Sequence, residues 1–200
     1  MKLVMTFEEL LQKEKEYAIN QNIEKIYTDY LKDEYQLKIK NYCKKYNLDI
    51  EEVNSRIRAK DRITASIFIK DPLKQNITEN LISTYLKTPK LPAGGKRCVR
   101  FDGEGNIVYA KGNNISKSAD FYINGVYYTQ KYTNEPGGAQ DNQFADVEQF
   151  LRNGSKKHKV GAILDGNYWK IHKKILEKEF GCNPNIKITC ADKLKEEITP

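Results

Sequence analysis

Asp120 and Lys131 lie in one short segment, "ADFYINGVYYTQKYT" (residues 119–133), that contains the residue types needed for phosphate chemistry. A carboxylate binds a hard divalent cation through its oxygen atoms. A nearby ammonium group favours hydroxide formation and offsets charge that develops on a phosphate. Asn124-Gly125, in the middle of the segment, is the strongest short signal for a two-residue β-hairpin turn. The segment therefore predicts a hairpin that carries an acid and a lysine.

The register of this hairpin decides whether the two groups meet. The strand pairs expected from the turn are Ile123 with Val126, Phe121 with Tyr128, and Asp120 with Thr129. Because strand side chains alternate between faces, Lys131 lies on the same face as Thr129. The sequence thus places Asp120, Thr129 and Lys131 together, with apolar residues on the opposite face. An ordinary surface ion pair is the alternative interpretation of the Asp120–Lys131 pair.

A helix is predicted directly after the hairpin, from about Ala139 to Arg152, preceded by Pro136-Gly137-Gly138. Its apolar stripe consists of Phe144, Val147 and Leu151. Gln140 and Gln143 lie towards the inward side of this helix. The free N–H groups at its N-terminus suit a phosphate. Satisfying local backbone groups is the alternative role for the two glutamines.

The remaining elements must position these residues. The first third of the chain is predicted to be helical, with helix starts at Thr6, at Asp49 and at Asp71-Pro72. Strands are predicted at "RCVRF" and "IVYA" after a proline- and glycine-rich connector that begins at Pro89. Strand "VGAIL", a helix from about Tyr168 to Phe180, strand "IKITC" and a terminal helical turn follow. Asp165, at the end of "VGAIL", is interpreted as a helix N-cap.

Composition limits the classes of function. Two hundred residues with 39% apolar content suffice for one compact α+β domain. The formal net charge of +7 favours a polyanionic partner such as nucleic acid. The four cysteines have no CxxC spacing, so neither a zinc site nor a disulfide framework is indicated. The sequence has no signal-peptide-like apolar region at its start and no membrane-spanning run, and we expect a cytoplasmic protein.

These features resemble a known family. Asp120, a β-turn and Lys131 at the end of "TQK", followed by an inward glutamine-bearing helix and a further strand, resemble the PD-(D/E)xK nuclease superfamily. The stretch "QKYTNEPGGAQDNQF" is more specifically similar to type II restriction endonucleases, and the resemblance covers roughly residues 75–164. It implies a restriction-endonuclease-like core (helix, mixed β-sheet, helix, strand) in residues 89–200. Residues 1–88 form an N-terminal helical elaboration that includes the first core helix, and the whole is expected to be one compact domain.

The resemblance also implies roles for individual residues. Asp120 would bind Mg²⁺, and Lys131 would position or help deprotonate the attacking water and stabilise the pentacovalent phosphate. Family members usually carry an acid two residues before the lysine, where this chain has Thr129. Some members tolerate a non-acidic residue there and draw ligands from backbone carbonyls or water. Glu79, on the preceding helix, is the candidate for a second catalytic and metal-binding carboxylate, and solvation alone is its alternative role.

Basic and amide side chains are the candidates for contacts with DNA. They are Lys117, Gln143, Lys156, Lys157 and Arg62. For the segments around Arg62 and around Lys156, plain solvent exposure is the competing interpretation.

The sequence therefore predicts an Mg²⁺-dependent type II restriction endonuclease of a restriction-modification system. It would hydrolyse double-stranded DNA at a short specific sequence, as a homodimer because both strands must be cut. A non-cleaving DNA-binding module of the same fold, or a structure-specific DNA nuclease, is the alternative.

Overall fold

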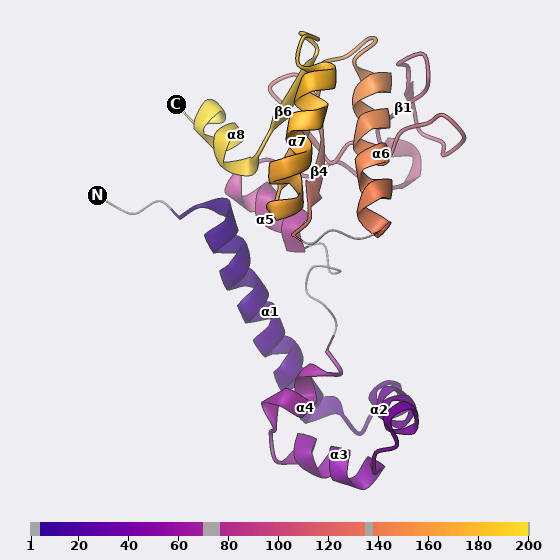
Figure 1. Ribbon diagram of the computed structural model, residues 1–200, viewed down its shortest axis with the longest axis vertical. Helices are drawn as coiled ribbons and strands as arrows, with labels where there is room; N and C mark the ends of the chain where they lie inside the picture. Colours follow the sequence, from indigo (N-terminus) through magenta and orange to yellow (C-terminus); the bar gives the residue numbers. More distant parts are fainter. Residues whose placement is uncertain (1–4, 70–76, 135–137, 200) are drawn as a thin grey trace. The chain divides into compact units, whose positions relative to one another are not determined.

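The computed structural model describes residues 5–69, 77–134 and 138–199, and side chains from residue 141 in the last range (Figure 1). The chain divides into two compact units. The helical unit comprises Glu9–Ile77, and the sheet unit comprises Met1–Glu8 with Thr78–Pro200. The helix that carries Glu79 therefore groups with the sheet unit.

The helical unit is built from helices that share a buried apolar core. Their bounds are Phe7–Asp29 for α1, which begins in the sheet unit, Asp33–Tyr46 for α2, Ile50–Arg58 for α3 and Arg62–Ser66 for α4. Ile23, Ile26, Ile39 and Ile57 are buried in their common core. The predicted helix start at Asp49 is confirmed, because its side chain accepts a hydrogen bond of 3.0 Å from the Glu51 N–H. The start predicted at Asp71-Pro72 lies outside the described residues.

The sheet unit alternates helices and strands. Its elements are α5 (Ile77–Tyr85), the 3-10 turn η2 (Gly95–Arg97), β1 (Arg100–Phe101), β2 (Ile107–Val108), β3 (Phe121–Ile123), β4 (Val126–Tyr132), α6 (Gly138–Gly154), β5 (Val160–Asp165), α7 (Asn167–Phe180), β6 (Ile186–Thr189) and α8 (Ala191–Ile198). The predicted mixed α+β class is confirmed by the helices and the mixed sheet within the described residues.

The main sheet has the strand order β3-β4-β5-β6. β3 and β4 are antiparallel, whereas β4, β5 and β6 run parallel. The predicted hairpin register is confirmed, since Phe121 pairs with Tyr128 and Ile123 with Val126. Gly125, in the turn, has φ of +81°, a conformation that favours glycine.

Strands β1 and β2 do not extend the main sheet, in contrast to the run of three or more antiparallel strands expected from the sequence. They form a separate two-stranded sheet. The reason is visible in their hydrogen bonds. Phe101 donates its N–H to the Ser116 hydroxyl and accepts from the Ser116 N–H at 2.9 Å, so a side chain replaces a regular ladder partner.

Helices cover both faces of the sheet. All six residues of β5 are buried, as expected for a parallel strand between two helix layers. Val160, Ala162 and Leu164 pack with Phe150 of α6 and Trp169 of α7, which lie side by side over the sheet (Figure 1). α8 contacts β5, and α8 is joined to α5 by a hydrogen bond between the Tyr85 hydroxyl and Asp192.

No helix within the described residues combines the length and the apolar character that a bilayer span requires.

Gly166 allows β4 and α7 to approach closely at the end of β5. Its φ is +95°, and a Cβ atom there would lie 2.3 Å from the Thr133 carbonyl oxygen. We expect Gly166→Ala to lower the free energy of unfolding by about 3 kcal/mol, because strain and a backbone clash add. Gly125→Ala is the matched control, since its φ is also positive but no atom lies within 4 Å. It should cost only about 1 kcal/mol in urea denaturation. If both variants lost the same free energy of unfolding, a backbone clash at position 166 would be contradicted.

Candidate active site

Asp120 lies immediately before β3, at an irregularity in the hairpin. Its N–H donates to the Tyr128 carbonyl at 2.7 Å, although Phe121 is already the ladder partner of Tyr128. Two residues of one strand thus face one residue of the other, which is a β-bulge. The Asp120 carbonyl accepts a 2.8 Å hydrogen bond from the Leu91 N–H. The Asp120 backbone is therefore held on two sides.

The carboxylate of Asp120 is bound by β4. Its Oδ2 accepts a 2.7 Å hydrogen bond from the Gln130 N–H and a 3.3 Å hydrogen bond from the Thr129 hydroxyl. Within the described residues, no hydrogen bond reaches Oδ1. The expected proximity of Asp120 and Thr129 is observed, although the bulge replaces direct pairing. One carboxylate oxygen is fixed and the other remains available.

The electrostatic surroundings of Asp120 bring in two further predicted residues. Burial raises the pKa of the Asp120 carboxyl, and the Lys131 ammonium and the Gln130 N–H oppose this rise. The negative charge of Glu79 raises the same pKa. Both Lys131 and Glu79 therefore lie within electrostatic reach of Asp120. Charged side chains from α5 and from β4 thus both influence the Asp120 carboxyl.

Glu79 approaches this group from the first turn of α5. Its side chain is one-third exposed, and its Oε2 lies 3.9 Å from the Lys90 Nζ. Glu79 thus has a charged partner on the protein as well as access to solvent.

α6 supplies one of the two predicted glutamines. The Gln143 Oε1 accepts a 2.9 Å hydrogen bond from the Thr133 hydroxyl, two residues beyond Lys131. The partner is a side-chain hydroxyl and not a backbone group, so this contact differs from the alternative role stated for the glutamines. The side chain of Gln140 lies outside the described part of the structure.

The basic residues expected at DNA already have partners on the protein. The Lys156 Nζ donates to the Gly103 carbonyl, and the Lys157 Nζ donates to Asn106 at 2.6 Å, so both contact the β1–β2 turn. Lys117 is 4.0 Å from Asp146 on α6. Arg62 donates to Asn20 at 2.7 Å in the helical unit. None of these contacts involves Asp120, Glu79 or Lys131.

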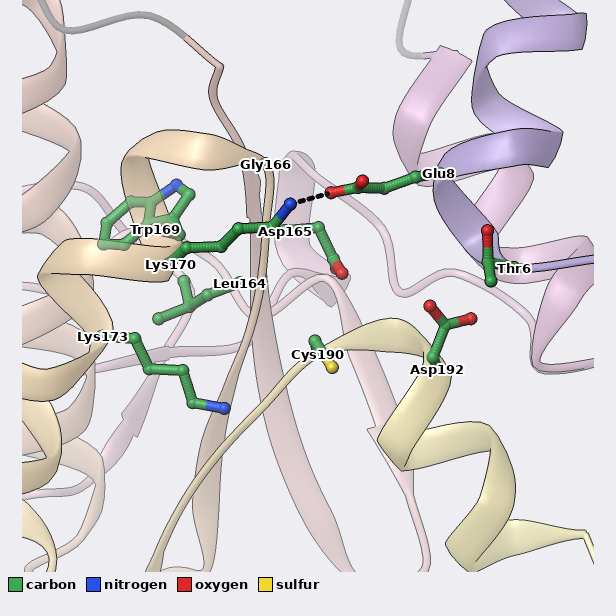
Figure 2. A pocket seen from close by; sticks show the side chains of 10 residues that line it. All are labelled: Thr6, Glu8, Leu164, Asp165, Gly166, Trp169, Lys170, Lys173, Cys190 and Asp192. Atoms are coloured by element: carbon green, nitrogen blue, oxygen red, sulfur yellow. Dashed lines mark ion pairs between the residues drawn. The ribbon is translucent and has the colours of Figure 1, made fainter.

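A cavity of about 310 Å³ lies one strand away from Lys131. Leu164, which lines it, is the ladder partner of Lys131. Figure 2 shows charged side chains from the end of β5, from α7, from α8 and from the start of α1 around this cavity. They are Asp165, Lys170, Lys173, Asp192 and Glu8.

Asp165 is the most perturbed group at the cavity. Burial raises the pKa of its carboxyl to about 7, and the charges of Asp192 and Glu8 act in the same direction. The Ala191 N–H, 3.3 Å from both carboxylate oxygens, opposes this rise. Asp165 therefore contacts the first residue of α8, whereas the N-cap of the adjacent α7 is Gly166. The interpretation of Asp165 as an N-cap is wrong for α7.

The sequence does not indicate the surroundings of two charged residues in this region. Lys90 belongs to a proline-containing connector, and no spacing rule links it to Glu79. Asp165 was recognised as a strand-terminal acid, but its burial depends on α8, which is 26 residues away in the sequence.

The donor set limits the metal chemistry of the site. Among the described residues, no three His, Cys, Asp or Glu side chains come together in a group suited to a metal ion. Asp120 and Glu79 provide a pair of carboxylates, of which one oxygen on Asp120 accepts no described hydrogen bond. Hard oxygen donors of this kind suit Mg²⁺, which commonly retains several waters and takes one or two carboxylates. The residues present therefore fit such an ion, with few protein ligands.

No protein-family model matches this chain, and no solved structure is significantly similar to it.

Asp165 makes the stability of the fold depend on pH. Its raised pKa means that the folded state retains a proton between about pH 4 and pH 7 that the unfolded state releases. Stability should therefore fall as the pH rises through this range. Asp165→Asn removes the buried charge and keeps an acceptor for the Ala191 N–H. We expect the free energy of unfolding of this variant to be about 1–3 kcal/mol higher than that of the wild type at pH 8. This difference should shrink towards pH 4.

Urea unfolding at both pH values measures this difference. Asp146→Asn, which changes a partly exposed acid on α6, is the control and should show little dependence on pH. A pH-independent effect of Asp165→Asn would contradict the assignment.

Proposed function

We propose that the protein is an Mg²⁺-dependent endonuclease of double-stranded DNA, of the type II restriction class within the PD-(D/E)xK superfamily. The observation that carries the proposal is the arrangement around Asp120. Its carboxylate is oriented by the Gln130 N–H and lies within electrostatic reach of both Glu79 and Lys131. An acid pair that can hold a metal ion, beside a lysine that can stabilise negative charge, is one combination that supports phosphodiester hydrolysis.

Each residue has a role that follows from its position. Asp120 and Glu79 would hold the ion, and the hydrogen bond from Gln130 keeps Asp120 in one orientation. When bound, Mg²⁺ polarises the phosphate and lowers the pKa of a bound water. Lys131 would orient the attacking water and stabilise negative charge on the phosphate. The Thr129 hydroxyl donates to Asp120, so it supports the orientation of the carboxylate.

The proposed substrate and assembly follow from charge and symmetry. The formal net charge of +7 favours a polyanion such as DNA. The described part of the chain carries one such group, so cleavage of both strands at one site calls for a homodimer with two-fold symmetry.

A non-cleaving DNA-binding module is the second candidate. The observation that favours it is Thr129, which stands where the family usually has an acid two residues before the lysine. This candidate predicts salt-sensitive DNA binding without a cleavage product. A nuclease for branched DNA would instead prefer branched substrates over linear duplex.

Cleavage in the presence of Mg²⁺ tests the proposal directly. Plasmid and linear DNA are incubated with the protein in Mg²⁺ or in EDTA, and discrete fragments are expected only in Mg²⁺. Lys131→Ala should reduce the rate by about 100-fold or more, because it removes charge stabilisation in the transition state. Lys178→Ala, which removes a charge from the exposed end of α7, is the control and should cleave normally. DNA binding without any Mg²⁺-dependent product would support the binding module instead.

Glu79 is tested through the Mg²⁺ dependence of the rate. Glu79→Gln preserves the size of the side chain and removes a ligand charge, so the Mg²⁺ concentration at half-maximal rate should rise about tenfold or more. Glu196→Gln, at an exposed position of α8, should leave that concentration unchanged. If the Mg²⁺ dependence of the rate were unchanged in Glu79→Gln, Glu79 would not be a ligand of the ion.

A further inference from the structure

Lys90 is tied by its backbone to the segment that carries Asp120. It forms an isolated antiparallel bridge with Phe121, the residue after Asp120. The next residue, Leu91, donates its N–H to the Asp120 carbonyl at 2.8 Å. The connector after α5 therefore runs along the edge of β3, beside the bulge.

The Lys90 side chain reaches back to the first turn of α5. Its Nζ donates a 2.6 Å hydrogen bond to the Asn80 side chain and lies 3.9 Å from the Glu79 Oε2. About one-third of each charged side chain is exposed, 35% for Lys90 and 33% for Glu79. Asn80 thus anchors the ammonium group next to Glu79, and the described residues provide Glu79 with no other ion-pair partner.

The two carboxylates therefore have separate lysine partners. Lys131 acts on Asp120, and Lys90 contacts Glu79. A partly exposed ion pair contributes only about 0–1 kcal/mol, so Lys90 holds Glu79 weakly. A divalent cation a few ångströms from the ammonium group would be repelled more strongly than that. Lys90 consequently competes with a divalent cation for Glu79 and contributes little to holding the Glu79 side chain in place.

We propose that Lys90 is the internal counter-ion of Glu79, which neutralises this carboxylate until a divalent cation replaces the ammonium group. The inference rests on the proposed function in so far as Glu79 is a cation ligand. It assigns Lys90 a positioning role, acting through Glu79, that sets how tightly the site binds the ion. The displaced ammonium group then lies beside the bound ion, where it is available to a phosphate of the DNA backbone.

Binding of Mn²⁺ alone, followed by the electron paramagnetic resonance signal of the free ion, tests the proposal without any cleavage assay. Lys90→Met should lower the dissociation constant for Mn²⁺ about three- to tenfold, because the repulsion is lost. Lys90→Arg, which keeps the charge, should stay close to the wild type. Lys178→Met controls for a general change in net charge. In the Glu79→Gln background, Lys90→Met should have little further effect.

DNA binding provides the second measurement. In Ca²⁺, Lys90→Met should bind duplex DNA more weakly than Lys90→Arg, although it binds the divalent ion more tightly. Unchanged or weaker Mn²⁺ binding by Lys90→Met would overturn the role of Lys90 and leave the nuclease proposal standing. Tighter Mn²⁺ binding by this variant, with no DNA cleavage by the wild type, would support the counter-ion and refute the nuclease.

Discussion

The hydrogen bond from the Gln130 N–H to Asp120 is the interaction on which the candidate site depends. Tyr127 and Thr133 direct their N–H groups to the β5 side, so the N–H of Gln130 faces the β3 side. There β3 has given way to a bulge, and a buried N–H without an acceptor would cost about 1–3 kcal/mol. The carboxylate of Asp120 supplies the acceptor. The Asp120 side chain thus satisfies a backbone N–H of the sheet with one oxygen and leaves the other oxygen available to a ligand. Folding of the sheet therefore fixes the position of this carboxylate.

The burial of β5 explains where charged groups occur. Both faces of this strand are covered by helices, and a charge at its centre would be strongly unfavourable. Charged side chains therefore lie at the carboxyl ends of the parallel strands, where Lys131 and Asp165 belong to neighbouring strands. The same covering of helices that excludes charge from the middle of the sheet also withdraws Asp120 and Asp165 from water. Their raised pKa values are a direct result of the layered packing.

Local signals predicted the hairpin well, because the Asn124-Gly125 turn determines the pairing of Phe121 with Tyr128 through short-range geometry. The bulge at Asp120 was not predictable, since it depends on the Leu91 segment, which lies far away in the sequence. The charge-rich loop with Lys156 and Lys157 suggested contacts with DNA. In the structure these lysines bind the β1–β2 turn, a partner that composition does not reveal. Pairings between segments that are distant in the sequence, such as Lys157 with Asn106, require the fold itself.

The close approach at Gly166 has a mechanical consequence for Lys131. Thr133 donates its N–H to the Asp165 carbonyl and accepts from the Tyr168 N–H, so the end of β4 is joined to both β5 and α7. These hydrogen bonds restrain the backbone on two sides, and Lys131 extends from it two residues earlier. The backbone restraint therefore fixes the Cα position of Lys131, while the rotatable bonds of its side chain still allow the ammonium group to reorient towards a ligand.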